Sequence, residues 1–245
     1  LRMFSVDWSV FNEPALLDDN SWLIYILNGL GWTVSLAAAS FMLALVAGIL
    51  IGTASTLKNR PILHAFTTGW VELFRNIPLI VQIFLWFFVI PEFIPPMKTW
   101  MIENDPVCGQ FLSAFLCLGL FTSARLAEQI RSGIESLPPG QLNAAKAIGF
   151  TESQAYRYVI LPLALRLVLP PMTNEAMNLV KNTSIALTIG LSEVTMRSQE
   201  MGEATFQYFA AFTLATACYV VVTLVVNVLM RTIEKKTALV GFMAH

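Results

Sequence analysis

The chain has 245 residues, of which 56% are hydrophobic and 13% charged, and its mean hydropathy is +0.65. A soluble domain carries about 25% charged residues, so this composition indicates a membrane protein. The formal net charge of −1 leaves no surplus of basic residues to neutralise phosphates, which excludes a nucleic-acid-binding protein. The three cysteines lack metal-ligand spacing and are interpreted as apolar filling, so no metal site is predicted.

Apolar stretches dominate the chain, and a helix needs about 20 such residues to cross a membrane. We expect five spans, at residues 30–54, 66–90, 109–130, 159–181 and 207–230. Pro78 is expected to kink the second span, and Pro162, Pro170 and Pro171 to interrupt the fourth. Residues 1–245 are therefore expected to form a single all-α transmembrane domain.

The loop charges alternate between two sides of the membrane. Loops on one side are acidic, as at Asp18 before the first span, and loops on the other side are basic, as at Lys58 after it. The positive-inside rule then places the N-terminus outside and the C-terminus in the cytoplasm. It also places the loop of residues 136–158 in the cytoplasm.

This loop predicts two short helices. Residues 136–140 favour a turn, and residues 141–148 are rich in helix formers. Gly149 is suited to end the first helix, and Thr151 to cap a second one that runs to Tyr158. The residues alone leave two interpretations open: a knob that docks into a protein partner, or an ordinary hairpin on the lipid headgroups.

Polar residues form stripes on two spans. The stripe on the fourth span consists of Asn174, Asn178, Lys181 and Asn182. The stripe on the third span consists of Thr122, Arg125 and Gln129. Polar groups at membrane depth must face protein or water, so we expect the two stripes to face each other across a pocket. Arg125 can hold a carboxylate through two parallel hydrogen bonds, or it can pair with Glu128 or Gln129 on its own helix.

Glu72 and Arg75 are three residues apart and are expected to form a structural ion pair.

The cytoplasmic loop has the spacing of a known motif, carried by Asn143-Ala144-Ala145, Gly149, Val159 and Leu161-Pro162. This spacing resembles EAA-x3-G-x9-I-x-LP of ABC-importer permeases, with Asn143 in place of Glu and Val159 in place of Ile. The resemblance implies a coupling helix that sits in a cleft of a cytoplasmic ATPase. The residues then expected to contact the ATPase are Gln141, Asn143, Ala144, Ala145, Ala147, Gly149 and Tyr156.

Other stretches are similar to permeases of polar amino-acid ABC importers. Residues 72–82 resemble their ExxRxxPLxxQ run, and residues 134–141 resemble their GIxSxPxGQ run. The sequences VELFRNIPLIVQ, CLGLFTSAR and PPMTNEAMNLVKN resemble permeases of glutamate/aspartate importers in particular. The resemblance implies a type I importer permease fold and ATP-driven import of acidic amino acids. The alternatives are glutamine or another polar amino acid as cargo and, in another class, an ion-coupled secondary transporter.

The resemblance also implies a cargo site and partners. The residues expected to bind the cargo are Thr122, Arg125, Asn174, Asn178 and Asn182. The expected partners are two ATPase subunits, a second related permease subunit and a periplasmic solute-binding protein. The chain has no Walker A run, so we expect it to be no enzyme itself and to leave ATP and Mg²⁺ to the partner ATPase. Its expected location is the bacterial inner membrane.

Overall fold

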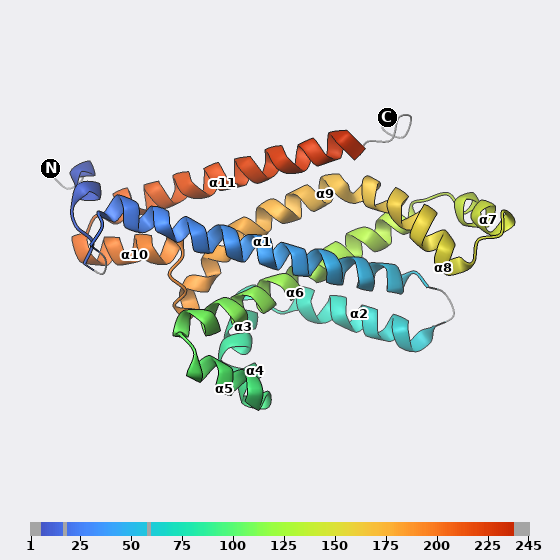
Figure 1. Ribbon diagram of the computed structural model, residues 1–245, viewed down its shortest axis with the longest axis horizontal. Coiled ribbons are helices and arrows are strands. Elements are labelled where there is room, and N and C mark those ends of the chain that lie inside the picture. Colours follow the sequence, from blue (N-terminus) through green and yellow to red (C-terminus); the bar gives the residue numbers. More distant parts are fainter. Residues whose placement is uncertain (1–5, 17–18, 58–59, 238–245) are drawn as a thin grey trace. The chain divides into compact units, whose positions relative to one another are not determined.

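The computed structural model describes residues 6–16, 19–57 and 60–237 and is helical throughout these ranges, apart from loops and one isolated β-bridge (Figure 1). Asp18 and Lys58, which contributed to the predicted orientation, lie outside these residues. The chain divides into two compact units. Unit 1 comprises Leu1–Ser40, Leu79–Leu118 and Leu179–Val225, and unit 2 comprises Phe41–Pro78, Gly119–Asn178 and Val226–His245.

Among the described residues, three helices are long and apolar enough to cross a membrane: α1 (Trp22–Ser55), α6 (Pro106–Glu135) and α11 (Tyr208–Thr237). A fourth candidate is the helix pair α2 (Pro61–Asn76) and Leu79–Phe93, which is broken at residues 77–78. The second segment of that pair comprises α3 (Leu79–Phe84), the π-helical turn η2 (Leu85–Val89) and α4 (Ile90–Phe93). The break confirms the kink expected at Pro78, because Ile77 has extended dihedral angles (φ −89°, ψ 129°). Helix α9 (Leu161–Asn182), the expected fourth span, is not among these candidates.

The expected interruption of the fourth span is wrong, because α9 continues through Pro170 and Pro171. A membrane helix tolerates proline where neighbouring helices and side chains satisfy the backbone groups that it frees. Pro162 lies in the first turn of α9, directly after a π-helical turn, η3 (Tyr156–Ile160). Such a wider turn gives the proline ring more room against the preceding carbonyl groups.

The core of unit 2 is formed by α1, α6 and α9, whose buried apolar side chains include Ala44, Leu126 and Val168. Gly52 allows the backbones of α1 and α6 to approach closely. A Cβ atom at this position would lie 2.5 Å from the carbonyl oxygen of Ala127. Close backbone approach at small residues increases van der Waals contact, which holds membrane helices together.

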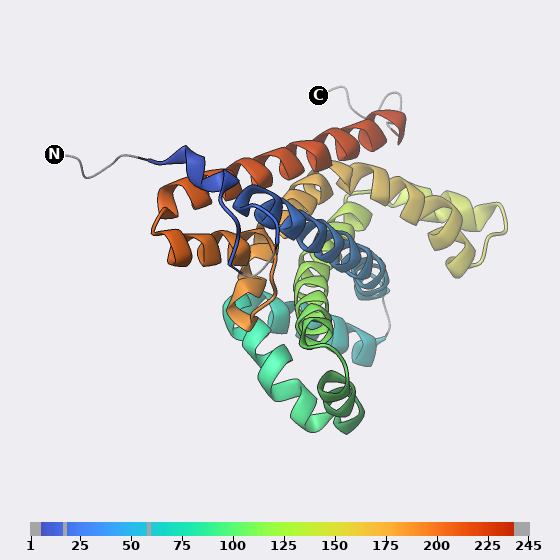
Figure 2. The same cartoon turned by 60° about the vertical axis from the view of Figure 1, so that its left-hand side comes forward.

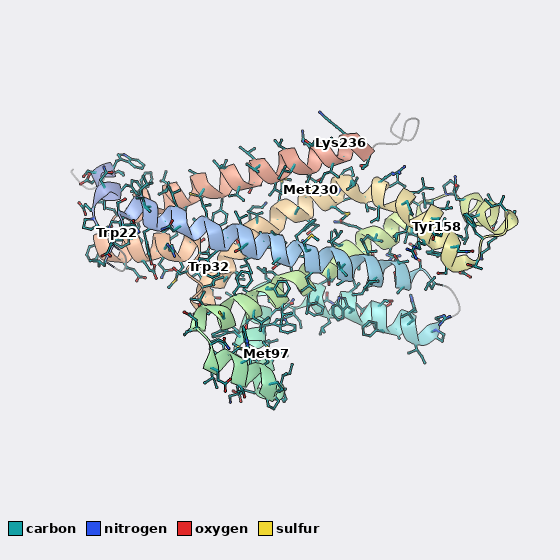
Figure 3. All side chains as sticks on the ribbon, viewed as in Figure 1. Trp22, Trp32, Met97, Tyr158, Met230 and Lys236 are labelled. Atoms are coloured by element: carbon teal, nitrogen blue, oxygen red, sulfur yellow. The ribbon has the colours of Figure 1, made fainter. Side chains whose placement is uncertain are left out.

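The core of unit 1 lies where the first turns of α1 and α11 meet α10 (Val194–Thr205), three segments that Figure 2 shows side by side. Trp22, labelled in Figure 3, is 2% exposed and stacks edge-on against Tyr25 with ring centroids 5.7 Å apart. Two shorter helical segments belong to the same unit: α5 (Pro95–Glu103) and the 3₁₀ helix η4 (Thr183–Ile189).

A fully buried carboxylate connects three elements of unit 1. Glu193 caps α10 by accepting hydrogen bonds from the backbone N–H groups of Thr195 at 2.8 Å and Met196 at 3.0 Å. Its other oxygen accepts a hydrogen bond of 2.5 Å from the hydroxyl of Tyr219 on α11 and one of 3.3 Å from Thr33 on α1. A buried carboxylate is stable only when its oxygens are bonded in this way.

Replacing Glu193 by alanine is expected to destabilise unit 1. The change removes the helix cap and leaves the Tyr219 hydroxyl without its carboxylate acceptor, at a combined cost of about 2–4 kcal/mol. The measurement is the thermal unfolding midpoint in detergent, compared with that of Glu203→Ala. Glu203 lies on the same helix but is exposed and accepts a hydrogen bond of 2.8 Å from the Gln199 amide. Equal midpoints for the two variants would contradict the structural role of Glu193.

Candidate functional site

The loop expected to bind a partner forms a helical hairpin in unit 2, between the ends of α6 and α9 (Figure 1). Its helices are α7 (Gly140–Ala147) and α8 (Glu152–Ala155). We call residues 140–155 the α7–α8 hairpin. Two short helices are expected from the sequence, and the structure confirms the first. The second begins as expected but does not end at Tyr158, because the helical backbone continues through η3 into α9.

Gly149 closes the first helix of the hairpin in a left-handed conformation, with φ +93°. The N–H of Phe150 donates to the Ala145 carbonyl at 3.1 Å, and the N–H of Gly149 donates to the Lys146 carbonyl at 3.0 Å. These two bonds form a Schellman motif, which glycine favours because it has no Cβ atom to clash. The expected helix end at Gly149 is confirmed.

Thr151 caps the second helix, as expected. Its hydroxyl accepts a bond of 3.3 Å from the N–H of Gln154, whose side-chain oxygen accepts one of 2.9 Å from the N–H of Thr151. Lys146 and Glu152 add an ion pair of 3.7 Å across the turn, and both side chains are largely exposed. The hairpin therefore has a defined turn from local interactions alone.

The hairpin presents small side chains to its surroundings. Four of the seven residues expected to contact the ATPase are exposed: Asn143, Ala144, Ala147 and Gly149. Ile148 is 75% exposed beside them, a large apolar side chain that is not in the set expected from the sequence. Its signal is the placement of an aliphatic residue between a row of alanines and the terminal glycine.

The other three expected contact residues face the protein to differing degrees. Ala145 is 3% exposed and packs inward, while Gln141 is half-buried. Tyr156 is also half-buried, and its hydroxyl oxygen accepts a bond of 3.3 Å from the Thr56 hydroxyl, just beyond the end of α1. Tyr156 thus braces the hairpin against α1. Tyr158, labelled in Figure 3, lies two residues further along and is 59% exposed.

A second polar cluster lies between α6 and α9 in unit 2. Arg125 and Glu175 approach to 3.7 Å, which is an ion pair without a direct hydrogen bond. The amide nitrogen of Gln129 lies 3.5 Å from the other oxygen of Glu175, and the amide oxygen of Gln129 is buried without a hydrogen-bond partner among the described residues. The Arg125 guanidinium also lies over the ring of Phe121, 5.0 Å from its centroid.

Through Arg125 and Gln129, the polar stripe on α6 thus contacts Glu175 of α9. Sequence reasoning did not place Glu175 in the cargo site. The signal was a carboxylate at membrane depth, directly after Asn174 in the polar stripe. The alternative pairing of Arg125 with Glu128 does not form. Glu128 instead accepts a hydrogen bond from Arg131. Arg125 keeps 44% of its side-chain surface exposed, so the guanidinium can bind a further anion.

The remaining predicted cargo residues are spread over different surroundings. Thr122 is buried, with 2% exposure, whereas Asn178 is half-buried. Asn174 is exposed and lines a cavity between α9 and α11. Asn182, the last residue of α9, belongs to unit 1. Of the predicted set, only Arg125 has an ion-pair partner in the described part of the chain.

The ion pair expected between Glu72 and Arg75 is not formed in the described residues. Both side chains are exposed and line a polar cavity of about 300 Å³ between α2 and α6. An exposed pair of this kind gains little free energy, so water competes successfully for both groups.

Comparison with known proteins finds a matching family and similar sequences. Residues 44–239 match the family described as "Binding-protein-dependent transport system inner membrane component". The chain is 43% identical to the glutamate/aspartate import permease protein GltJ of Escherichia coli K12 over 243 residues, which cover 98% of each chain. It is 31% identical to the probable glutamine ABC transporter permease protein GlnM of Bacillus subtilis, with 92% and 97% of the two chains covered.

Two solved structures resemble the fold. One is an amino acid ABC transporter crystallised with histidines, with a TM-score of 0.72 at 28% identity over 88% of this chain and 95% of the other. The second is the inward-facing methionine transporter MetNI, with a TM-score of 0.70 at 19% identity over 89% and 98%. The second likeness concerns the fold alone.

Proposed function

Because the chain belongs to the family of binding-protein-dependent transport system inner membrane components, we propose that it is the permease subunit of an ATP-driven importer for glutamate and aspartate. As a member of this family it is an inner-membrane protein that works with an ATPase and a solute-binding protein. The observation that carries the choice of cargo is the likeness to the E. coli glutamate/aspartate permease, which extends over nearly the whole chain.

The proposal includes five membrane spans, with α9 as the fourth, the N-terminus outside and the C-terminus in the cytoplasm. Two ATPase subunits and a second, related permease subunit complete the membrane complex. ATP and Mg²⁺ bind to the ATPases, and this chain contributes no catalytic residue. The alternation of acidic and basic loops along the sequence supports this orientation.

The α7–α8 hairpin is proposed as the part that receives the ATPase motion. Its exposed alanines and Gly149 allow a partner's cleft to close around α7, and the exposed Ile148 provides apolar area to bury there. Inside the protein, Ala145 and Tyr156 fix the hairpin to unit 2. A force applied to the exposed face is therefore passed to α1 and α9, which pack together in the unit 2 core.

Arg125 is proposed to bind a cargo carboxylate, with Glu175 as its counter-ion in the empty permease. Glutamate and aspartate carry both charges of this pair, so the side-chain carboxylate of the cargo can bind Arg125 while its ammonium group binds Glu175. The unpartnered amide oxygen of Gln129 supplies a further acceptor for that ammonium group. Asn178 lies one turn from Glu175 on α9 and is the amide proposed to assist. Thr122 and Asn182 remain further candidates for the cargo path, whereas Asn174 lines a separate cavity between α9 and α11.

Uptake by the assembled transporter in proteoliposomes tests this function. We expect radiolabelled glutamate to accumulate only when the binding protein is outside and the ATPases are supplied with ATP. Unlabelled aspartate should compete, whereas unlabelled glutamine should compete weakly, because its side chain ends in an amide and offers Arg125 no carboxylate. If glutamine competed more strongly than aspartate, the proposed cargo would instead be a neutral amino acid. Glutamate uptake by this chain alone under an ion gradient would contradict ATP-driven transport.

A further inference from the structure

Unit 2 contains a polar cavity of about 430 Å³ between α9 and α11. Asn174 contributes an amide from α9, and α11 contributes Asn227, Arg231, Glu234 and Lys235. Asn227, Arg231 and Lys235 are spaced four residues apart, so they form one stripe along the helix. The volume lies in the range of small-molecule binding sites.

The charged groups of this cavity are not neutralised by one another. Neither Arg231 nor Lys235 forms an ion pair in the described residues, although Glu234 lines the same cavity. The net charge of the three side chains is +1. Two cations and two side-chain amides are therefore available as hydrogen-bond donors to an anion.

The cavity lies at the basic end of a membrane-length helix. Helix α11 ends at Thr237, so Lys235 is near its last turn, and Asn227 lies about 12 Å deeper along the helix axis. Met230, labelled in Figure 3, packs against the apolar core of unit 2. Pro170 and Met177 of α9 give the cavity an apolar wall. The site therefore combines a cationic rim, deeper amides and apolar side chains at a membrane boundary.

We propose that this cavity binds the phosphate-bearing headgroup of an anionic phospholipid. A guanidinium and an ammonium group together hold a phosphate through charge-assisted hydrogen bonds. Asn174 and Asn227 can bond to the glycerol oxygens, while the acyl chains follow the apolar helix surfaces. Basic pockets between membrane helices, at the side with anionic headgroups, are suited to such lipids. A free phosphate offers the same anionic chemistry but makes no use of the apolar wall.

Thermal unfolding of the assembled, detergent-solubilised transporter tests the proposal. The transporter is titrated separately with short-chain phosphatidylglycerol, short-chain phosphatidylcholine, inorganic phosphate and glutamate. A ligand that binds the folded state raises the unfolding midpoint further as its concentration increases relative to its Kd. We expect phosphatidylglycerol to stabilise the transporter at far lower concentration than the other three compounds.

The variants Arg231→Gln and Lys235→Gln should each raise the phosphatidylglycerol concentration needed for the same rise in midpoint by about fivefold. Glu234→Gln should lower that concentration, because it removes the one negative charge of the cavity. Lys236→Gln is the matched control: Lys236 is the next residue along, is exposed and is not among the cavity-lining residues.

Each other result overturns the proposal in a distinct way. Equal stabilisation of the wild type and both cavity variants would place the lipid elsewhere. Stabilisation by inorganic phosphate at equal concentration, lost in the variants, would make the cavity a site for a soluble anion. Stabilisation by glutamate that is lost in the same variants would identify the cavity as a cargo site. Glutamate uptake is measured in parallel, so a failure of the lipid site leaves the proposed function intact.

Discussion

Replacing Gly149 by aspartate is expected to uncouple ATP hydrolysis from uptake. Gly149 adopts φ +93°, a conformation that costs a residue with a Cβ atom about 1–2 kcal/mol. Apart from the two adjoining residues, no part of the described chain lies within 4 Å of the position that a Cβ would occupy, so the change strains the turn without disturbing the core. It also adds a charge to the surface proposed to enter the ATPase. We expect uptake per ATP hydrolysed to fall by about tenfold or more, since a 1.4 kcal/mol shift alone changes a population tenfold.

The measurement is glutamate uptake and ATP hydrolysis on the same proteoliposomes, with membrane insertion checked separately. Gly140→Ala is the matched control. Gly140 begins α7 in the same hairpin, has no atom near its Cβ position and does not have a positive φ. This control should transport normally. If Gly149→Asp also retained a normal ratio of uptake to hydrolysis, the hairpin would not be the coupling element.

Replacing Arg125 by alanine is expected to remove selectivity for acidic amino acids. A hydrogen bond to a charged group contributes about 1.5–3 kcal/mol, so the KM for glutamate should rise roughly ten- to a hundredfold. The change also leaves Glu175, whose side chain is 13% exposed, without its counter-ion. The double variant Arg125→Ala/Glu175→Gln removes that uncompensated charge. It should recover stability without recovering glutamate uptake.

Two further variants separate cargo binding from folding. Arg131→Ala is the matched control, because Arg131 lies on the same helix but is already bonded to Glu128 and Glu135. It should leave the preference for glutamate over glutamine unchanged. Glu175→Gln should weaken the binding of amino acids more than that of glutarate, which has two carboxylates and no ammonium group. If Arg125→Ala kept the wild-type KM for glutamate and aspartate, Arg125 would not belong to the cargo site.

The α7–α8 hairpin was largely predictable because its structure depends on neighbouring residues. A helix-ending glycine at 149 and a capping threonine at 151 act within one turn of the backbone, so their positions in the sequence suffice. The inward orientation of Ala145 and Tyr156 was not predictable. It depends on where α1 lies, and the Thr56 hydroxyl that bonds to Tyr156 is 100 positions away in the sequence.

The prolines of α9 illustrate the opposite case. Local chemistry predicts a break at Pro170 and Pro171, yet the helix continues. Whether a helix breaks at a proline also depends on its packing, and α9 packs against α1 and α6. The bend at Pro78 followed the local rule. The same residue type therefore gave one correct and one wrong prediction, according to whether tertiary packing opposed it.

By itself the sequence determined the helical membrane class, the hairpin with its turn residues, and a resemblance specific enough to identify the family. These properties follow from composition, from short-range backbone preferences and from spacing, all of which are local. Only the tertiary structure decided that Arg125 pairs with Glu175, that Asn174 faces a different cavity, and that Glu193 connects three elements of unit 1. Such partners are set by which helix faces meet, and that depends on the packing of segments far apart in the chain.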